Sequence, residues 1–112
     1  MSTATINAHA VARWLRVDDL NSLAVALRDM HPADIVGLVG EFTPADTARV
    51  LLCLDQARQA TLFGYFPPET QVALAEAIDR RDMARIFGAM AHDERADLFA
   101  QLDEGQKAAL LP

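Results

Sequence analysis

A twelve-residue repeat constrains what this 112-residue chain can fold into. The segment from Met30 to Asp34 is matched by the segment from Phe42 to Asp46, with proline, alanine and aspartate in the same order. Counting on in steps of twelve, every copy opens with an apolar residue: Met30, Phe42, Leu54, Phe66, Ile78, Met90 and Leu102. A fixed period of this kind is typical of helical arrays, in which small units bury their apolar faces against their neighbours.

The positions after each apolar start predict a helix. In four of the seven copies, the first of these positions holds a residue that caps helices well. The column is His31, Thr43, Asp55, Pro67, Asp79, Ala91 and Asp103. Proline, which suits a first helical position, follows at Pro32, Pro44 and Pro68. The eighth and ninth positions after each start are mostly large and apolar, so each copy is predicted to be a helix of about ten residues, roughly 15 Å long.

The expected fold class is all-α, a superhelix or solenoid of short antiparallel helices. One- or two-residue turns would make successive helices double back as hairpins. Helices this short are marginal in isolation, so they must bury their apolar columns against one another. No alternating β-branched run and no Asn-Gly hairpin predicts a strand. Glycines inside the predicted helices favour close helix–helix approach: Gly37, Gly40, Gly64, Gly88 and Gly105.

The length predicts a single domain. Residues 1–17 are expected to be a frayed five-residue start followed by an N-terminal helix, and residues 18–112 to form the superhelical part. The acids Asp18 and Asp19 indicate the start of a second helix, because they favour the positive end of its dipole. The buried stripe of that helix should include Leu23, Val25 and Leu27.

The composition excludes several classes of function. A net charge of −6 argues against nucleic-acid binding, which needs a basic face to neutralise phosphates. The single Cys53 excludes an internal disulfide framework and fits a reducing compartment. No apolar run reaches the roughly 18 residues of a membrane-spanning helix, and the N-terminus lacks the features of a signal peptide. This piece is therefore expected to be soluble and cytoplasmic.

No catalytic constellation emerges from the sequence. Cys53 lies in the apolar run from Val50 to Leu54 with no histidine beside it, which predicts a core residue rather than a nucleophile. His31 and His92 fall at predicted helix ends. The sequence contains no CxxC, HExxH or EF-hand motif. The chain is predicted not to be an enzyme.

One acidic cluster has the composition of a cation site. Asp93 and Asp97 are four residues apart, so they project from one face of a helix, and Glu94 flanks them. Hard cations such as Mg²⁺ take oxygen ligands and retain several waters. These acids could form half of a magnesium site, with the remaining ligands supplied by a partner surface. The alternative is a solvated helix start, where acids are expected from the dipole alone.

These residues together resemble a known family. The segment from His31 to Ile35, the twelve-residue helices that open with Pro or Asp, and the segment from Asp93 to Leu98 resemble the cytosolic N-terminal domain of MgtE-type magnesium transporters. The resemblance covers the chain from about Asp18 to Leu111. It implies a right-handed superhelix of short helices, followed in the family by paired CBS domains and a membrane pore domain, in a homodimer.

The resemblance implies a magnesium-sensing regulatory role on the cytoplasmic side of the inner membrane. Mg²⁺ would bind between acidic surfaces of the N and CBS domains and favour the closed pore. By position, Asp93, Glu94 and Asp97 match the acidic stretch that faces the CBS pair, and Thr61 stands where some relatives carry an acid. The chain stops before any CBS or membrane segment, so it resembles an excised domain that does not itself conduct ions.

Two other interpretations remain open at this level. The first is a helical protein-interaction module of the flagellar motor switch type, which also uses short paired helices and an opening that resembles Glu-His-Pro-Gln. Here Met30 and Asp34 replace the Glu and the Gln, which counts against that assignment. The second alternative is a stand-alone helical scaffold.

Overall fold

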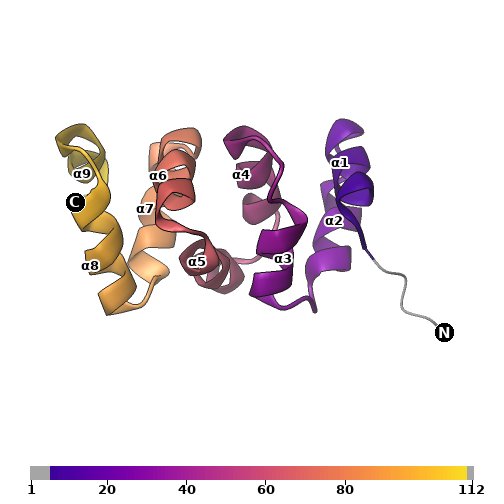
Figure 1. Ribbon diagram of the computed structural model, residues 1–112, viewed down its shortest axis with the longest axis horizontal. Helices are drawn as coiled ribbons and strands as arrows, with labels where there is room; N and C mark the ends of the chain where they lie inside the picture. Colours follow the sequence, from indigo (N-terminus) through magenta and orange to yellow (C-terminus); the bar gives the residue numbers. More distant parts are fainter. Residues whose placement is uncertain (1–5, 111–112) are drawn as a thin grey trace.

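The computed structural model describes residues 6–110, and over this range its only regular secondary structure is helical (Figure 1). This confirms the all-α class. The helices are α1 (Ala8–Arg16), α2 (Leu20–Leu27), α3 (Pro32–Leu38), α4 (Pro44–Leu52), α5 (Gln56–Tyr65), α6 (Pro68–Ala77), α7 (Arg80–Ala89), α8 (His92–Gln101) and α9 (Glu104–Leu110). The frayed start expected at residues 1–5 lies outside the described residues.

Successive helices begin twelve residues apart, from Ala8 at the start of α1 to Glu104 at the start of α9. The predicted caps form at Thr43, Asp55 and Asp79, whose side-chain oxygens accept the backbone N–H three residues on at 3.1, 2.9 and 2.8 Å. These bonds satisfy N–H groups that a helix cannot pair internally. Asn7 and Asp19 cap α1 and α2 in the same way. The twelve-residue spacing of capped helix starts therefore also includes these two helices, which precede the repeat found in the sequence.

Each helix connection from Leu54 onward contains one buried apolar residue, and from Phe66 onward that residue is the first of the connection. The two residues between α5 and α6 are both extended, and the same holds between α6 and α7 and between α7 and α8. An extended residue directs its side chain away from the helix that has just ended, here into the core. The buried connection residues are Leu54, Phe66, Ile78, Met90 and Leu102. Each therefore joins two helices and contributes to the core at the same time.

Helices two apart in the sequence pack most extensively on one another: α3 on α5, α4 on α6, α5 on α7, α6 on α8 and α7 on α9. The prediction that successive helices pair as antiparallel hairpins is therefore wrong for most of the chain. The exceptions with substantial contact are α1 with α2 and α4 with α5. An extended dipeptide advances the chain by about 3.3–3.6 Å per residue instead of reversing it, so the next helix is displaced from its predecessor.

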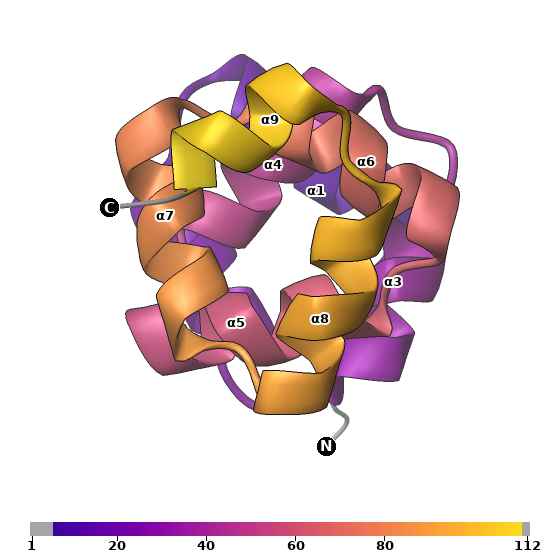
Figure 2. The same cartoon turned by 90° about the vertical axis from the view of Figure 1, so that its left-hand side faces the viewer.

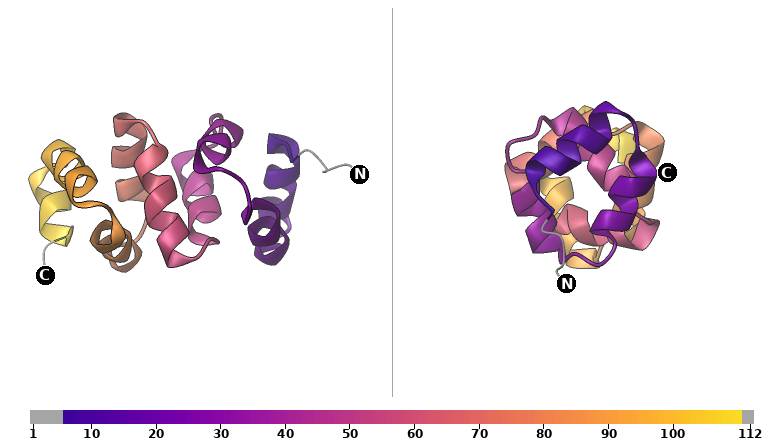
Figure 3. Two further views of the ribbon diagram at one scale, coloured as in Figure 1. Left: turned by 90° about the horizontal axis from the view of Figure 1, so that it is seen from below. Right: turned by 90° about the vertical axis from the view of Figure 1, so that its right-hand side faces the viewer.

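The described helices succeed one another along one axis, from α1 at one end to α8 and α9 at the other (Figures 1 and 3). The molecule measures 48 × 25 × 21 Å along its principal axes. Seen along the long axis, the helices lie around a roughly round outline (Figure 2). Among the residues from 6 to 110, no helix is both long and apolar enough to cross a membrane.

Two details of the expected pattern are wrong near the N-terminus. Val25 is 60% exposed, because it follows Leu23 by two residues and so faces away from the buried side of α2. The connections after α3 and after α4 are longer than the predicted one or two residues. The first has five residues, since α3 ends at Leu38 and two tight turns follow, closed by bonds from Gly40 N–H to Gly37 and from Phe42 N–H to Val39. The second has three residues, from Cys53 to Asp55.

Side chains from later repeats complete the C-terminal ends of earlier helices. Gln71 Nε2 donates to the carbonyls of Phe63 and Phe66 at 3.2 and 3.0 Å, at the end of α5. Gln59, twelve residues earlier, makes the equivalent bonds at the end of α4. Arg58 reaches further and donates to two carbonyls at the end of α2. These bonds supply donors to carbonyl groups at helix ends, where the regular helical pairing stops. The Phe63 and Leu27 carbonyls also accept a backbone N–H, from Phe66 at 3.3 Å and from Met30 at 3.1 Å.

We expect Met90→Ala to lower the free energy of unfolding by about 2–5 kcal/mol, because it leaves a cavity at a buried connection. Urea unfolding followed by circular dichroism measures the change. Val25→Ala is the control, and as an exposed position it should stay within about 0.5 kcal/mol of the parent. Equal effects of the two substitutions would contradict the anchoring role of the connections.

Gln71→Leu should lower the free energy of unfolding by about 1–3 kcal/mol, because it removes the side-chain donor to the Phe66 carbonyl and one of the two donors to the Phe63 carbonyl. The same measurement on Gln101→Leu provides a matched control, since Gln101 is exposed and bonds only within its own helix. A Gln71→Leu chain as stable as the control would show that solvent replaces the amide at no cost.

Candidate functional site

The predicted acidic residues lie at the start of α8. The residue at the N-cap position is Ala91, whose side chain cannot accept a hydrogen bond. Asp93 and Glu94 occupy the first turn that follows. Negative side chains there interact favourably with the free N–H groups and the positive end of the helix dipole. The start of α8 therefore depends on charge where most other starts use a capping side chain.

Asp93 and Asp97 are both exposed and stand one turn apart on α8. Within residues 6–110, neither carboxylate takes part in an ion pair. Arg95, the nearest cation in sequence, is directed to His92, with 3.2 Å between Nη2 of the arginine and Nδ1 of the histidine. Both carboxylates are thus exposed, and neither is paired with a positive group in the described part of the chain.

Glu94 is positioned differently from the two aspartates. Its carboxylate lies against Gly64 near the end of α5, where a Cβ atom would come within 2.7 Å of Oε2. The close approach predicted at this glycine is therefore present, although the approaching group is a side chain. The same prediction is wrong at Gly37 and Gly88, which have nothing within 4 Å of a Cβ. The sequence analysis did not predict the contact between Glu94 and Gly64, because the two residues are thirty positions apart in the chain.

Thr61 lies on α5, three residues before Gly64 and thus on a neighbouring part of the same face. It is exposed, and its hydroxyl donates to the carbonyl of Ala57 at 3.1 Å. A neutral hydroxyl that is already bonded to its own helix adds no negative charge here. The acidic character of this surface comes from α8.

The donor chemistry suits a hard divalent cation, but the ligand set is incomplete. In the described part of the chain, no three His, Cys, Asp or Glu side chains are grouped so as to hold a metal ion. Asp93 and Asp97 supply carboxylate oxygens, and Mg²⁺ is commonly held by one or two carboxylates with several retained waters. Asp93 and Asp97 therefore fit one half of a metal site shared with a partner surface better than a complete metal site formed by the described residues alone.

Cys53 has the environment of a packing residue. It is partly buried against the core at the end of α4, and its Sγ donates to the carbonyl of Val50 at 3.0 Å. Burial raises the pKa of this thiol to about 11. The thiol is consequently protonated at neutral pH and is a poor nucleophile.

Gly64→Ala should raise the free energy of unfolding by about 0.5–1 kcal/mol, because alanine favours the helix and the exposed Glu94 side chain can swing aside. The gain is measured by thermal unfolding of four proteins: the parent, Gly64→Ala, Glu94→Ala and the double variant Gly64→Ala/Glu94→Ala. The gain should be at least as large when Glu94 is absent. Destabilisation only in the presence of Glu94 would show that its carboxylate is held rigidly.

Comparison with known proteins assigns the chain to a family. No curated protein matches it significantly. The family model described as the MgtE intracellular N domain matches residues 30–112, which include α3 to α9. The matched region contains the repeat and all three acids at the start of α8, whereas α1 and α2 precede it. The chain belongs to the MgtE intracellular N domain family.

Proposed function

We propose that this chain is the cytosolic regulatory domain of a magnesium transporter and senses Mg²⁺ through the start of α8. Family membership supports the transporter context, and we propose a regulatory, non-enzymatic role for this region. The observation that supports sensing is the pair of exposed carboxylates, Asp93 and Asp97, one turn apart and without an ion pair among the described residues.

Electrostatics links this pair to gating. Two like charges on one helix face repel each other, and an acidic partner surface brought against them adds further repulsion. A divalent cation held between the two surfaces screens that repulsion and supplies attraction. Because it binds only the docked arrangement, it shifts the population toward that arrangement. Loss of Mg²⁺ then allows the surfaces to separate.

Glu94 has a secondary place in this proposal. Its carboxylate lies over Gly64 on α5, which orients it apart from the two aspartates. From there it contributes negative charge to the surface and reaches a shared ion by moving away from α5. The proposed ligands are thus Asp93 and Asp97, with Glu94 as a third acid.

The proposed partners are the CBS domains and the membrane pore domain of the full-length transporter, assembled as a homodimer at the inner membrane. We also propose that the helices wind as the right-handed superhelix of the family. The twelve-residue spacing of helix starts and the packing of helices two apart support that winding. It presents the start of α8 at the surface, where a partner domain can reach it.

Titration of the ¹⁵N-labelled chain with Mg²⁺ tests the site. We expect the amide resonances of residues 92–98 to shift first, and the Asp93→Asn/Asp97→Asn variant to lose that response. A matched control removes two exposed acids of α6, Glu69→Gln/Glu76→Gln, and should respond as the parent does.

The same variants separate the site from a general effect of charge. If the Asp93→Asn/Asp97→Asn pair and the control reduce the response equally, Mg²⁺ is screening net charge and α8 has no special role. In the full-length transporter, Mg²⁺-dependent protection from proteolysis that survives Asp93→Asn/Asp97→Asn would contradict the assignment directly.

A further inference from the structure

Helices α1 and α2 do not follow the packing of the rest of the described chain. From α3 to α9, each helix packs mainly on the helices two places away, whereas α2 packs extensively only on α1. The contact of α1 with α4 is the most extensive that this pair makes with the other described helices. Figure 1 shows the pair together at one end of the molecule. We call residues 8–27, which comprise α1, α2 and their connection, the N-terminal hairpin.

A tight turn joins the two helices of the hairpin. Asp18 has a φ of 59° and is the one residue with a positive φ among residues 6–110. This left-handed conformation helps to reverse the chain, and the Asp19 N–H donates to the Trp14 carbonyl at 2.8 Å across the turn. Antiparallel helices joined by a short turn pack on one another as a local unit. The contacts between α1 and α2 therefore all lie within residues 8–27.

Two arginines of the repeat attach the C-terminal ends of the hairpin helices. Arg49 of α4 donates to the Leu15 carbonyl in the last turn of α1 at 3.2 Å, and its Nη2 lies 3.0 Å from Oδ1 of Asp18. Arg58 of α5 makes the equivalent attachment at the end of α2, where it donates to two carbonyls at 2.9 and 2.8 Å. A charged donor strengthens such bonds, and a positive group is favoured at the negative end of a helix dipole.

The boundary between the hairpin and the repeat contains two cavities. One, of about 290 Å³, lies between α1 and α4, and its lining includes Leu15 and Arg49. The other, of about 210 Å³, lies between α2 and the connection after α4, and its lining includes Val25 and Arg58. Each attaching arginine thus lies beside a cavity. Space at these positions replaces side-chain packing, and a low density of apolar contacts is typical of segments that open locally.

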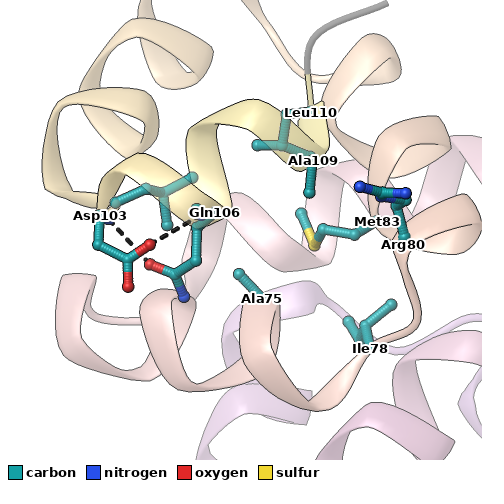
Figure 4. Close-up of a pocket in the computed structure, with 10 residues that line it drawn as sticks. Ala75, Ile78, Arg80, Met83, Asp103, Gln106, Ala109 and Leu110 are labelled. Carbon is teal, nitrogen blue, oxygen red and sulfur yellow. Dashed lines mark hydrogen bonds between the residues drawn. The ribbon is translucent and has the colours of Figure 1, made fainter.

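A cavity by itself does not make such a boundary. Another cavity, of about 360 Å³, lies between α6, α7 and α9 beside Ala75, where the other copies of the repeat have a large apolar residue (Figure 4). There α7 and α9 pack directly on one another, as helices two apart do along the repeat. At the hairpin, α2 and α4 make no comparable contact. The N-terminal hairpin therefore combines cavities with a break in the packing pattern.

The extent of the family match supports the same boundary. The matched region begins at Met30, in the connection between α2 and α3, and it includes α3 to α9. In repeat proteins each unit contacts only its neighbours, so stability is approximately a sum over units and their interfaces. An end unit with a weak interface is then able to separate while the remaining units stay folded.

We propose that the N-terminal hairpin opens as one unit while α3 to α9 stay folded, and that Arg49 and Arg58 hold it closed. The hinge is the connection formed by residues 28–31. Opening breaks both arginine attachments and exposes apolar side chains on both sides of the boundary, such as Leu15 and Phe42, which line the same cavity. The hairpin is a conformational device at the opposite end of the molecule from the acids of α8, and it does not depend on the proposed magnesium site.

Native-state hydrogen exchange of the parent chain, followed by NMR at increasing urea concentrations, tests opening as a unit. The slowest amides of α1 and α2 should share one urea dependence. It should be shallower than that of the slowest amides of α5 and α7, because opening the hairpin exposes less surface than global unfolding. One steep dependence for all helices, or different dependences for α1 and α2, would overturn the proposal.

A mild substitution in the repeat separates the two kinds of opening. Ile78→Val removes one buried methyl group from α6–α7, which stay folded when the hairpin opens. It should speed exchange of the slowest α5 and α7 amides several-fold and leave the hairpin amides unchanged. Equal acceleration in the hairpin would contradict the proposal, because it would mean that hairpin amides exchange only through global unfolding.

Arg58→Met tests how the hairpin is held closed. It keeps an unbranched side chain and removes the two bonds to the end of α2, so hairpin exchange should speed up about tenfold or more. Arg49→Met should have a smaller effect in the same direction, because its partner Asp18 is exposed. The matched control is Arg85→Met, whose parent side chain pairs with Asp82 of its own helix and should not influence the hairpin. Hairpin exchange in Arg58→Met equal to that in the control would contradict the role of the arginines.

Discussion

Burial of one apolar residue in the connections from Leu54 onward is the interaction on which the rest of the structure depends. The helices have only seven to ten residues, a length at which an isolated helix is marginal in water. Phe66, Ile78 and Met90 each close one helix and open the next while their side chains enter the core. The extended backbone at these residues then displaces each helix from its predecessor, so that helices two apart make the main contacts.

Polar contacts complete the same arrangement. Gln59 and Gln71 donate to the carbonyls that end α4 and α5. Arg58 does the same at the end of α2, which lies more than two repeats earlier in the chain. The glutamine bonds tie each helix to the one before it, and the Arg58 bonds tie α5 to the more distant end of α2. Toward the C-terminus the pattern changes. Arg95 turns to His92, and the amide nitrogen of Gln106 is buried without a partner among the described residues.

The proposed ion site and the cavity beside Ala75 both lie where one copy departs from the repeat. At the start of α8, alanine replaces the capping side chain, and the first turn carries acids that face solvent. In α6, Ala75 replaces a large apolar residue and leaves a cavity beside an unpaired donor. Local departures from an otherwise consistent pattern cost stability, so they are expected where a protein meets an ion, a ligand or a partner.

The sequence by itself determined the helix starts, the caps at Thr43, Asp55 and Asp79, the all-α class and the family, because these depend on residues close together in the chain. Only the tertiary structure decided which helices pack together, since the backbone angles of two connecting residues set the direction of each helix. It also decided that Glu94 lies on Gly64 and that the Gln106 nitrogen has no partner. Those contacts join segments a repeat or more apart, and a twelve-residue period carries no information about them.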